Sequence, residues 1–418
     1  MRYTDGMSKP KSSVVAVLDI GSSKVVCLIA KVDDQGKARI AGIGHQLSQG
    51  IKAGAIADVG QAEQSIVAAV HAAEQMAGET IERVVANVSC GAPSSLRVHV
   101  EVPLPGGAVT VRDLRKVIDQ GRSGFRQEDR HVIDVIPVNY TLDQESGIID
   151  PRGMFGSRLS ANLHVVTVGA TALRNLAASV ARCHLEPVGF VESSYAAGQA
   201  CLADDEKELG ACIIDMGGGV TKFSVFFEGR CVYTDSVPVG GIHVTSDIAK
   251  GLSTSIAAAE RIKTLHGSVI SSIADSRDLI DVPRMTGDDS DENENQSVPR
   301  LALIGIVRPR MEEIFEMVRG KLESSGFDKV AGKRLVLTGG ASQLLGLRDF
   351  ASQMLSKQAR LARPKTFEGL AESTSGPAFA TVVGLLEGAL AGRRGGAVSA
   401  APAGGLFKKA LVWVKENF

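Results

Sequence analysis

Three short turns carry the residue types that a phosphate-binding site needs. The first turn is Asp19-Ile20-Gly21-Ser22-Ser23-Lys24, and the second is Asp215-Met216-Gly217-Gly218-Gly219-Val220-Thr221. The third turn is Leu337-Thr338-Gly339-Gly340-Ala341-Ser342. Glycine allows positive φ and lets the backbone approach a ligand with no Cβ in the way. Because N–H groups exposed at such turns can cradle phosphate oxygens, we expect all three turns to contact a phosphorylated ligand.

The side chains of the first two turns predict a nucleotide phosphate accompanied by a metal ion. The Lys24 ammonium can neutralise phosphate charge. The aspartates that open the two turns, Asp19 and Asp215, can together orient a hydrated Mg²⁺, an ion that keeps several of its waters. Three hydroxyl groups could donate hydrogen bonds to phosphate, those of Ser22, Ser23 and Thr221.

A single strand–Asp–Gly turn is a weak signal, because tight hairpins use the same residues for turn geometry alone. Here two equivalent turns lie about 200 residues apart, and each falls between two apolar, β-branched segments. The expected strands are 14–20 and 25–32 around the first turn, and 211–214 and 222–227 around the second. This recurrence predicts a duplicated fold. The dinucleotide and P-loop fingerprints are absent at these turns, which argues against those folds.

The remaining elements follow from apolar periodicity. The third turn follows an expected strand at 334–337 and precedes a helix. Segment 92–168 changes character and reads as an inserted small α+β unit, with short strands and a helix near 112–121. Elsewhere the spacing predicts helices at 61–76, 172–183 and 193–202, and short strands at 81–89 and 188–191.

Composition limits the possible classes of protein. The chain has 418 residues, of which 44% are apolar and 22% charged, as is ordinary for a soluble globular protein. A net charge of -1 shows no global basic excess, so no nucleic-acid partner is expected. The first 13 residues lack the apolar stretch of a secretory signal, and no segment has the roughly 18 consecutive apolar residues of a membrane span.

The C-terminal segment has the pattern of a helix that lies in a lipid interface. Residues 391–405 are rich in Gly, Ala and Pro and read as a flexible linker, and residues 406–418 follow it. At 100° per residue, one apolar face collects Phe407, Ala410, Leu411, Val414 and Phe418, with Leu406 and Trp413 at its boundary. Opposite lie Lys408, Lys409 and Lys415, which suit anionic head groups, while Val412 lies among these charges. Packing on the protein's own core is the alternative, but the linker and the terminal position favour a membrane.

The three turns resemble the phosphate and adenosine motifs of the superfamily that includes actin, hexokinase and DnaK-type chaperones. Two further stretches resemble the FtsA family of bacterial division proteins: Gly240-Gly241-Ile242-His243-Val244-Thr245-Ser246-Asp247-Ile248 and Ala259-Glu260-Arg261-Ile262-Lys263. The resemblance covers about residues 14 to 418. It implies that Glu260 and Lys263 contact the adenosine of ATP. It also places Gly240, Gly241, Gly339, Gly340, Ala341 and Ser342 at the nucleotide.

The resemblance implies an α/β, actin-like (ribonuclease-H-like) fold duplicated in two lobes, with the inserted unit as subdomain 1C. Segment 188–198 resembles the helix that connects the lobes. Subdomain 1A would comprise 14–91, 169–203 and about 373–390, and subdomain 1C would comprise 92–168. Subdomain 2A would comprise 204–239 and 308–372, and subdomain 2B would comprise 240–307 with an acidic loop at 287–296. Residues 1–13 would be disordered, 391–405 would form a linker, and 406–418 would form the membrane helix.

Hydrolysis of ATP requires a group that orients water on the γ-phosphate. Actin uses a glutamine in its connecting region, and here that region offers Glu192 instead. Glu192 is therefore the candidate catalytic residue, and we expect ATP binding with weak turnover at most. His243 invites a catalytic reading, but a packing role after a Gly-Gly turn is favoured.

The family resemblance implies a function in cell division. The protein would polymerise on the cytoplasmic face of the inner membrane at the septum, tether the FtsZ ring there and recruit later division proteins. FtsA-like proteins bind the C-terminal tail of FtsZ through subdomain 2B, and three arginines near its end could meet an acidic peptide: Arg300, Arg308 and Arg310.

Three other functions remain open from the residues. A PilM-like ATP-binding component of type IV pilus assembly would share the fold and the insertion but lack the amphipathic tail. A DnaK-type chaperone would need a substrate domain, for which the chain has no room. A sugar or acid kinase would need an acceptor pocket with a catalytic base, and no such group of residues is evident.

Overall fold

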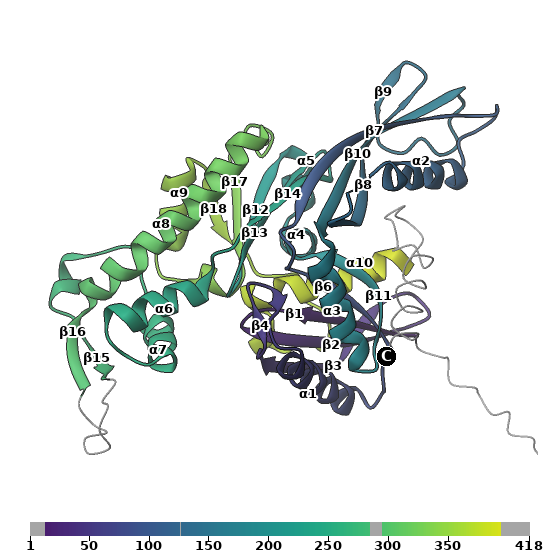
Figure 1. The fold of residues 1–418 in the computed structure, drawn as a ribbon. Coiled ribbons are helices and arrows are strands. Elements are labelled where there is room, and N and C mark those ends of the chain that lie inside the picture. Colours follow the sequence, from purple (N-terminus) through teal and green to yellow (C-terminus); the bar gives the residue numbers. More distant parts are fainter. Residues whose placement is uncertain (1–12, 126, 285–294, 394–418) are drawn as a thin grey trace, which may run out of the picture.

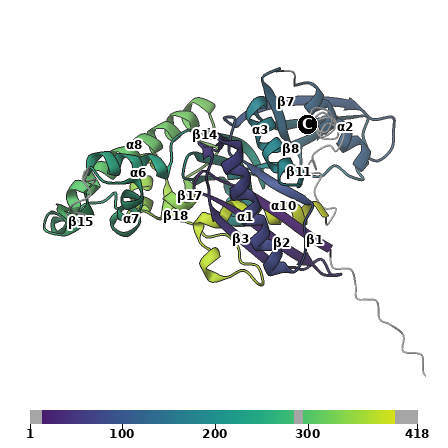
Figure 2. The same ribbon diagram turned by 60° about the horizontal axis from the view of Figure 1, so that its bottom comes forward.

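The computed structural model describes residues 13–125, 127–284 and 295–393, and two lobes and an inserted unit make up this part of the chain (Figure 1). Each lobe is built on a five-stranded sheet. The inserted unit lies at one end of the described part of the chain, and the hairpin of Leu279–Pro283 (β15) and Asn295–Pro299 (β16) lies at the other (Figure 2). Within these residues, no helix combines the length and the apolar character needed to cross a bilayer.

The two large sheets have the same topology, which confirms the predicted duplication. Their orders are β3-β2-β1-β6-β11 and β14-β13-β12-β17-β18. In each sheet the first three strands are antiparallel and the last three are parallel. The first-lobe strands are Ser13–Ile20 (β1), Lys24–Val32 (β2), Ala38–Leu47 (β3), Arg83–Val88 (β6) and Glu186–Glu192 (β11). The second-lobe strands are Ala211–Met216 (β12), Thr221–Phe227 (β13), Arg230–Val237 (β14), Arg334–Thr338 (β17) and Gln358–Leu361 (β18).

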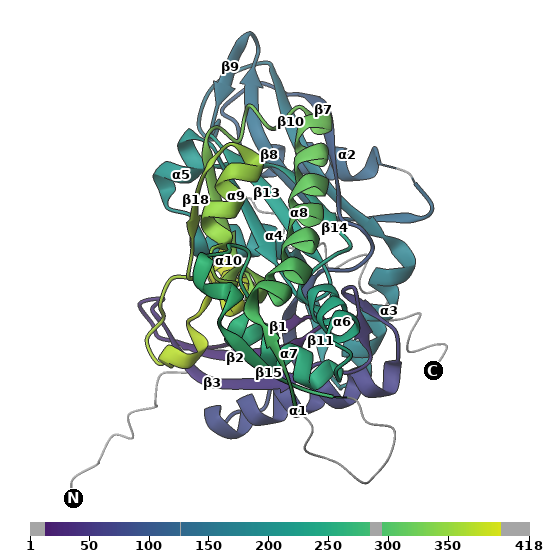
Figure 3. The ribbon, with the colours of Figure 1, turned by 90° about the vertical axis from the view of Figure 1, so that its left-hand side faces the viewer.

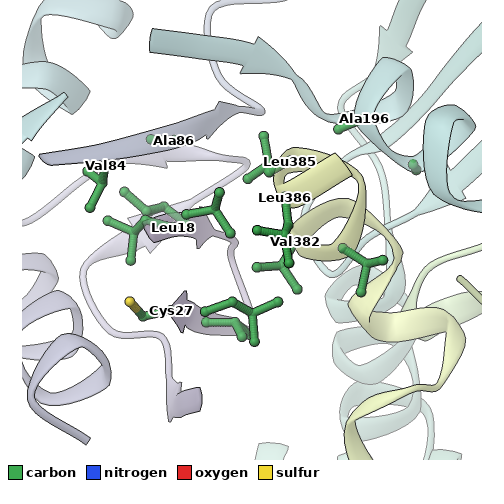
Figure 4. Close-up of a cluster of buried hydrophobic side chains, with 14 of the residues drawn as sticks. Leu18, Cys27, Val84, Ala86, Ala196, Val382, Leu385 and Leu386 are labelled. Atoms are coloured by element: carbon green, nitrogen blue, oxygen red, sulfur yellow. The ribbon is translucent and has the colours of Figure 1, made fainter. Parts of the chain in front are cut away.

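Helices cover both faces of the first sheet. Helix α1 (Val59–Ala77) packs on β2 and β3, and α10 (Ala380–Arg393) packs on β1 and β6 from the other side (Figure 1). Strands buried on both faces need near-continuous apolar sequence, which is why β1 and β2 were recognisable. Figure 4 shows this core, where Leu18, Ala86, Val382 and Leu386 meet. Further elements of this lobe are Ile51–Lys52 (β4), Ala55–Ile56 (β5), Ala170–Arg182 (α3) and Ser193–Cys201 (α4).

Helix α4 joins the two lobes. Of segment 188–198, expected to be the connecting helix, residues 193–198 belong to α4, whereas residues 188–192 belong to strand β11. It packs on α10 of the first lobe and on β12 and β13 of the second. The backbones of α4 and α10 approach so closely that a Cβ at Gly384 would lie 1.8 Å from the carbonyl oxygen of Ala196. Only glycine fits at this point, so the joint between the lobes depends on one residue type.

The second lobe carries additional helices beside its sheet. Helix α8 spans 26 residues and packs on both α6 and α9 (Figure 3). It begins at Arg300 and ends at Ser325, so the expected boundary between subdomains 2B and 2A at 307/308 falls inside one continuous helix. The elements of this lobe outside its sheet are Asp204–Leu209 (α5), Gly241–Gly251 (α6), Ile256–His266 (α7), Leu279–Pro283 (β15), Asn295–Pro299 (β16), Arg300–Ser325 (α8) and Leu347–Leu355 (α9).

The inserted unit has its own sheet, ordered β7-β10-β8-β9, and one helix. Its core is separate from those of the lobes. The unit also contacts the second lobe through two polar side chains. The Ser95 hydroxyl donates to the Thr234 carbonyl at 2.7 Å, and the buried His164 ring pairs with the Cys231 carbonyl at 3.0 Å. Its elements are Ser94–Pro103 (β7), Val111–Ser123 (α2), Arg130–Leu142 (β8), Glu145–Ile148 (β9) and Arg158–Gly169 (β10).

Several expected segment ends differ from the structure or lie outside the part of the chain that it describes. Residues 391–393, assigned to the linker, still belong to α10 because its last turn continues to Arg393. Residues 295 and 296 of the expected acidic loop begin β16, whereas residues 287–294 lie outside the described part of the chain. The expected membrane helix at 406–418 also lies outside it. The third turn continues into a short 3-10 helix, Gly340–Gln343, before α9 begins at Leu347.

We expect Gly384→Ala to lower the free energy of unfolding by about 1–3 kcal/mol, because the new methyl group would force α4 and α10 apart. Gly388, one turn further along α10, has no atom within 4 Å of a built Cβ. Gly388→Ala is therefore the matched control and should stabilise the helix by up to about 1 kcal/mol. Urea unfolding of both variants measures the difference, and equal effects would contradict the close contact.

Candidate nucleotide-binding site

All three turns line one cavity of about 1010 Å³ between the lobes. The first and second turns are the hairpin ends of β1–β2 and β12–β13, which the duplicated topology sets opposite each other. The expected residues that line the cavity are Asp19, Gly21, Ser22, Ser23, Lys24, Asp215, Gly217, Gly218, Gly219, Gly241, Glu260, Lys263, Gly339, Gly340 and Ala341.

The second turn is packed tightly from two sides. A Cβ at Gly219 would lie 3.0 Å from the backbone of Ala53 and 2.5 Å from the Ser22 hydroxyl oxygen. Gly339 of the third turn has φ +88° and ψ 165°, and a Cβ there would lie 2.5 Å from Asp215 Oδ1. The second turn therefore lies against serine side chains of the first turn and against the backbone of the third, and a larger residue at Gly219 or Gly339 would push the turns apart.

Asp19 is buried and held by Asn87, a residue that sequence reasoning missed. The Asn87 amide donates to Asp19 Oδ1 at 2.7 Å, and its own oxygen accepts from the Ile20 N–H at 2.7 Å. Burial raises the pKa of Asp19 to about 6, although Lys222 and Lys24 act to lower it. Asp19 is therefore largely ionised at pH 7.

Lys24 lines the cavity and also faces a buried aromatic ring. Its Nζ lies 3.4 Å from the centroid of the Phe379 ring, a cation–π contact. Burial lowers the pKa of Lys24 to about 8, against the opposing effect of Asp19 and Asp215. The ammonium is thus protonated at pH 7 and weakly solvated, which suits it to bind an anionic ligand.

Lys222 also lines the cavity and was not among the expected site residues. Its Nζ lies 3.1 Å from Asp215 Oδ2, and both side chains are nearly completely buried. Burial acts to lower the pKa of Lys222, but Asp215, Glu192 and Asp19 together raise it above its ordinary value. Asp215 and Lys222 are paired across the β12–β13 hairpin, so the strand register could have predicted the contact.

Helix α7 lines another part of the cavity with one of its faces. Lys263 Nζ lies 2.6 Å from Glu260 Oε2 and donates to the Thr245 hydroxyl and the Gly241 carbonyl at 2.8 and 3.1 Å. The other residues of this face that line the cavity are Ile256, Ala257, Thr264 and Gly267. Their spacing corresponds to one face of a helix. Gln343 and Leu344, next to the third turn, line the cavity as well.

Four expected residues do not line the cavity, and each makes a hydrogen bond within the fold. The Thr221 hydroxyl donates to the Val239 carbonyl at 2.8 Å, and the Ser342 hydroxyl donates to Gly339 at 2.8 Å. Gly240 donates its N–H to His243 Nδ1 at 3.1 Å, which gives His243 a packing role. Glu192 caps α4, accepting from the Tyr195 N–H at 2.7 Å.

Comparison with known proteins identifies the family. A model of "Cell division protein FtsA" matches residues 212–384, and a model of the "SHS2 domain inserted in FTSA" matches residues 91–167. The Cell division protein FtsA of Agrobacterium fabrum is 45% identical over 390 residues, which cover 91% of this chain and 88% of that protein. The chain belongs to the FtsA family. The FtsA of Rhizobium meliloti is 44% identical over 426 residues, which cover 98% of this chain and 96% of that protein.

Solved structures show the same fold at low sequence identity. A PilM–PilN type IV pilus biogenesis complex matches with a TM-score of 0.62, at 16% identity, and covers 90% of this chain and 98% of its own. MreB5 of Spiroplasma citri bound to ADP matches with a TM-score of 0.53, at 13% identity, and covers 92% of this chain and 99% of its own. The actin-like fold expected from the sequence is confirmed, and the relatives favour the FtsA family over the PilM alternative.

The three arginines suggested to meet an acidic peptide already have carboxylate partners within the chain. Arg300 lies 3.7 Å from both Asp275 and Asp278. Arg308 lies 2.9 Å from Glu312. Arg310 lies 2.6 Å from Asp247 and also contacts Glu313. A peptide carboxylate at any of them would have to compete with these ion pairs.

We expect Gly339→Ala to lower the free energy of unfolding by about 1–3 kcal/mol, because alanine strains the Gly-only backbone conformation and its Cβ meets Asp215. Gly340→Ala is the neighbouring control, since a Cβ at Gly340 would lie 3.9 Å from the nearest side chain. This control should change the free energy of unfolding by no more than about 0.5 kcal/mol. Urea unfolding curves that coincide for the two variants would contradict the third turn's geometry.

Proposed function

We propose that this FtsA-family protein binds ATP between its lobes and acts in cell division as a nucleotide-dependent scaffold. The observation that carries the proposal is the single cavity in which the three glycine-rich turns meet. The phosphates would lie against the turns and beside Lys24. The adenosine would lie along α7, where Glu260 and Lys263 offer an acceptor and a donor.

The surroundings of Glu192 favour ATP binding without rapid hydrolysis. This side chain is 2% exposed and does not line the cavity. Its Oε2 accepts from the Ser194 hydroxyl at 2.7 Å as well as from the α4 backbone. Burial also raises the pKa of Glu192. A carboxyl held in this way is poorly placed to orient water on a γ-phosphate, so slow hydrolysis at most is expected.

As a scaffold, the protein would polymerise when ATP holds the two lobes together. It would bind the FtsZ C-terminal tail through the part of the second lobe that contains α6, α7 and the start of α8. The polymer would present many copies of the segment 406–418 to an anionic inner membrane, and multivalency strengthens weak single contacts. In this role the protein would act at the septum and recruit later division proteins.

Nucleotide binding can be tested at each part of the cavity by isothermal titration of the full chain. Lys24→Met should weaken ATP binding at least about tenfold, as expected for a lost charge-assisted contact, but leave adenosine binding nearly unchanged. Lys263→Met should weaken both ligands. Lys250, an exposed lysine of α6 that does not line the cavity, provides the control Lys250→Met. Absence of heat with the unmodified protein would refute ATP binding.

Membrane attachment can be tested by co-sedimentation with anionic liposomes. A chain that ends at Gly404 should remain in the supernatant, whereas the full chain should sediment. Leu411→Glu places a charge on the expected apolar face and should abolish sedimentation. Val412→Glu places the same charge among the lysines and should reduce it only partly. Equal sedimentation of full and shortened chains would exclude this tail as the anchor.

A further inference from the structure

Lys222 lies at the point where the lobes meet in the nucleotide cavity. Its ammonium contacts both lobes, since Nζ donates to the Ser89 hydroxyl at 3.2 Å in the first lobe and pairs with Asp215 in the second. Its side chain is only 7% exposed. A lysine ammonium has three N–H donors, and the described residues provide two acceptors within hydrogen-bond distance.

The two carboxylates expected to orient Mg²⁺ are already engaged by the protein. Asp215 Oδ2 accepts from the Thr381 hydroxyl at 3.2 Å and pairs with Lys222, and Oδ1 lies against Gly339. Asp19 Oδ1 accepts from Asn87. A hydrated Mg²⁺ would have to share these carboxylates, and at Asp215 it would lie beside the ammonium already paired with that group, so the residues fit the ion poorly.

The charges on the cavity wall balance without a metal ion. Among the described residues that line it, three lysines face three carboxylates: Lys24, Lys222, Lys263, Asp19, Asp215 and Glu260. A divalent cation beside Lys222 would be repelled at short range in a largely buried place, where screening is weak. Moving Lys222 away would leave Asp215 buried and unpaired, which is costly.

We propose that Lys222 takes the place of a divalent cation between Asp19 and Asp215, so that this site binds nucleotide polyphosphate with little dependence on Mg²⁺. The inference rests on the proposed nucleotide binding and specifies its ionic requirement. The fixed ammonium neutralises the two aspartates and offers its remaining N–H to a phosphate oxygen. The nucleotide can therefore bind as the free anion, and its magnesium complex binds with similar affinity when the ion lies on the side of the phosphates away from Lys222.

The test is titration of the full chain with ATP in EDTA and, separately, in excess Mg²⁺. The dissociation constants should agree within about threefold. Nucleotide binding only in Mg²⁺ would overturn this inference and leave the proposed function intact. Absence of binding in both buffers would overturn the proposed function itself. The two failures are therefore distinguishable without any variant.

Substitution of the lysine provides a second, independent readout. Lys222→Gln keeps a hydrogen-bond donor but removes the charge, so affinity in EDTA should fall at least about tenfold and recover in Mg²⁺. Lys250→Gln makes the same change of net charge outside the cavity and should behave as the unmodified protein in both buffers. If Lys222→Gln shows equal loss in both buffers while its circular dichroism is native, the lysine does not replace a cation.

Discussion

A chain of buried hydrogen bonds through Lys222 ties the two lobes together. Its members, in order, are Asp19, Asn87, Ser89, Lys222, Asp215 and Thr381. Two of its links cross between lobes, since Ser89 and Thr381 belong to the first and Lys222 and Asp215 to the second. Buried charges are tolerated only when they are paired and hydrogen-bonded, so separation of the lobes would leave both members of the ion pair without part of their partners.

Packing of α10 against α4 also holds the two lobes together. Helix α10 contacts α4 along backbones brought together by Gly384, and its first turn supplies Thr381 to the polar chain. One helix therefore touches the aspartate of the second turn and also precedes the C-terminal segment. In the proposed scaffold, the first turn of this helix lies at the nucleotide cavity, and the sequence that follows its last turn leads to the expected membrane segment.

Much of the architecture was predictable because its signals are local. The strands β1, β2, β12 and β13 are apolar along their length, and the aspartate–glycine turns between them mark two equivalent hairpins. Lys222 could have been found as well, since the hairpin register pairs it with Asp215. By contrast, Asn87 and Phe379 reach the site from β6 and from the segment before α10, and no local pattern connects them to Asp19 or Lys24.

The sequence by itself determined the duplicated lobes, the inserted unit and the three turns, because strand periodicity and turn chemistry depend on neighbouring residues. Only the tertiary structure decided which polar groups are free to meet a ligand. Thr221 and Ser342 have the right chemistry, but their hydroxyls are used by nearby carbonyls. Lys222, by contrast, has a role at the site because two hairpins far apart in the chain bring carboxylates together around it. Long-range packing sets the contacts of Lys222 with Ser89 and of Asp215 with Thr381, and no spacing rule in one segment contains them.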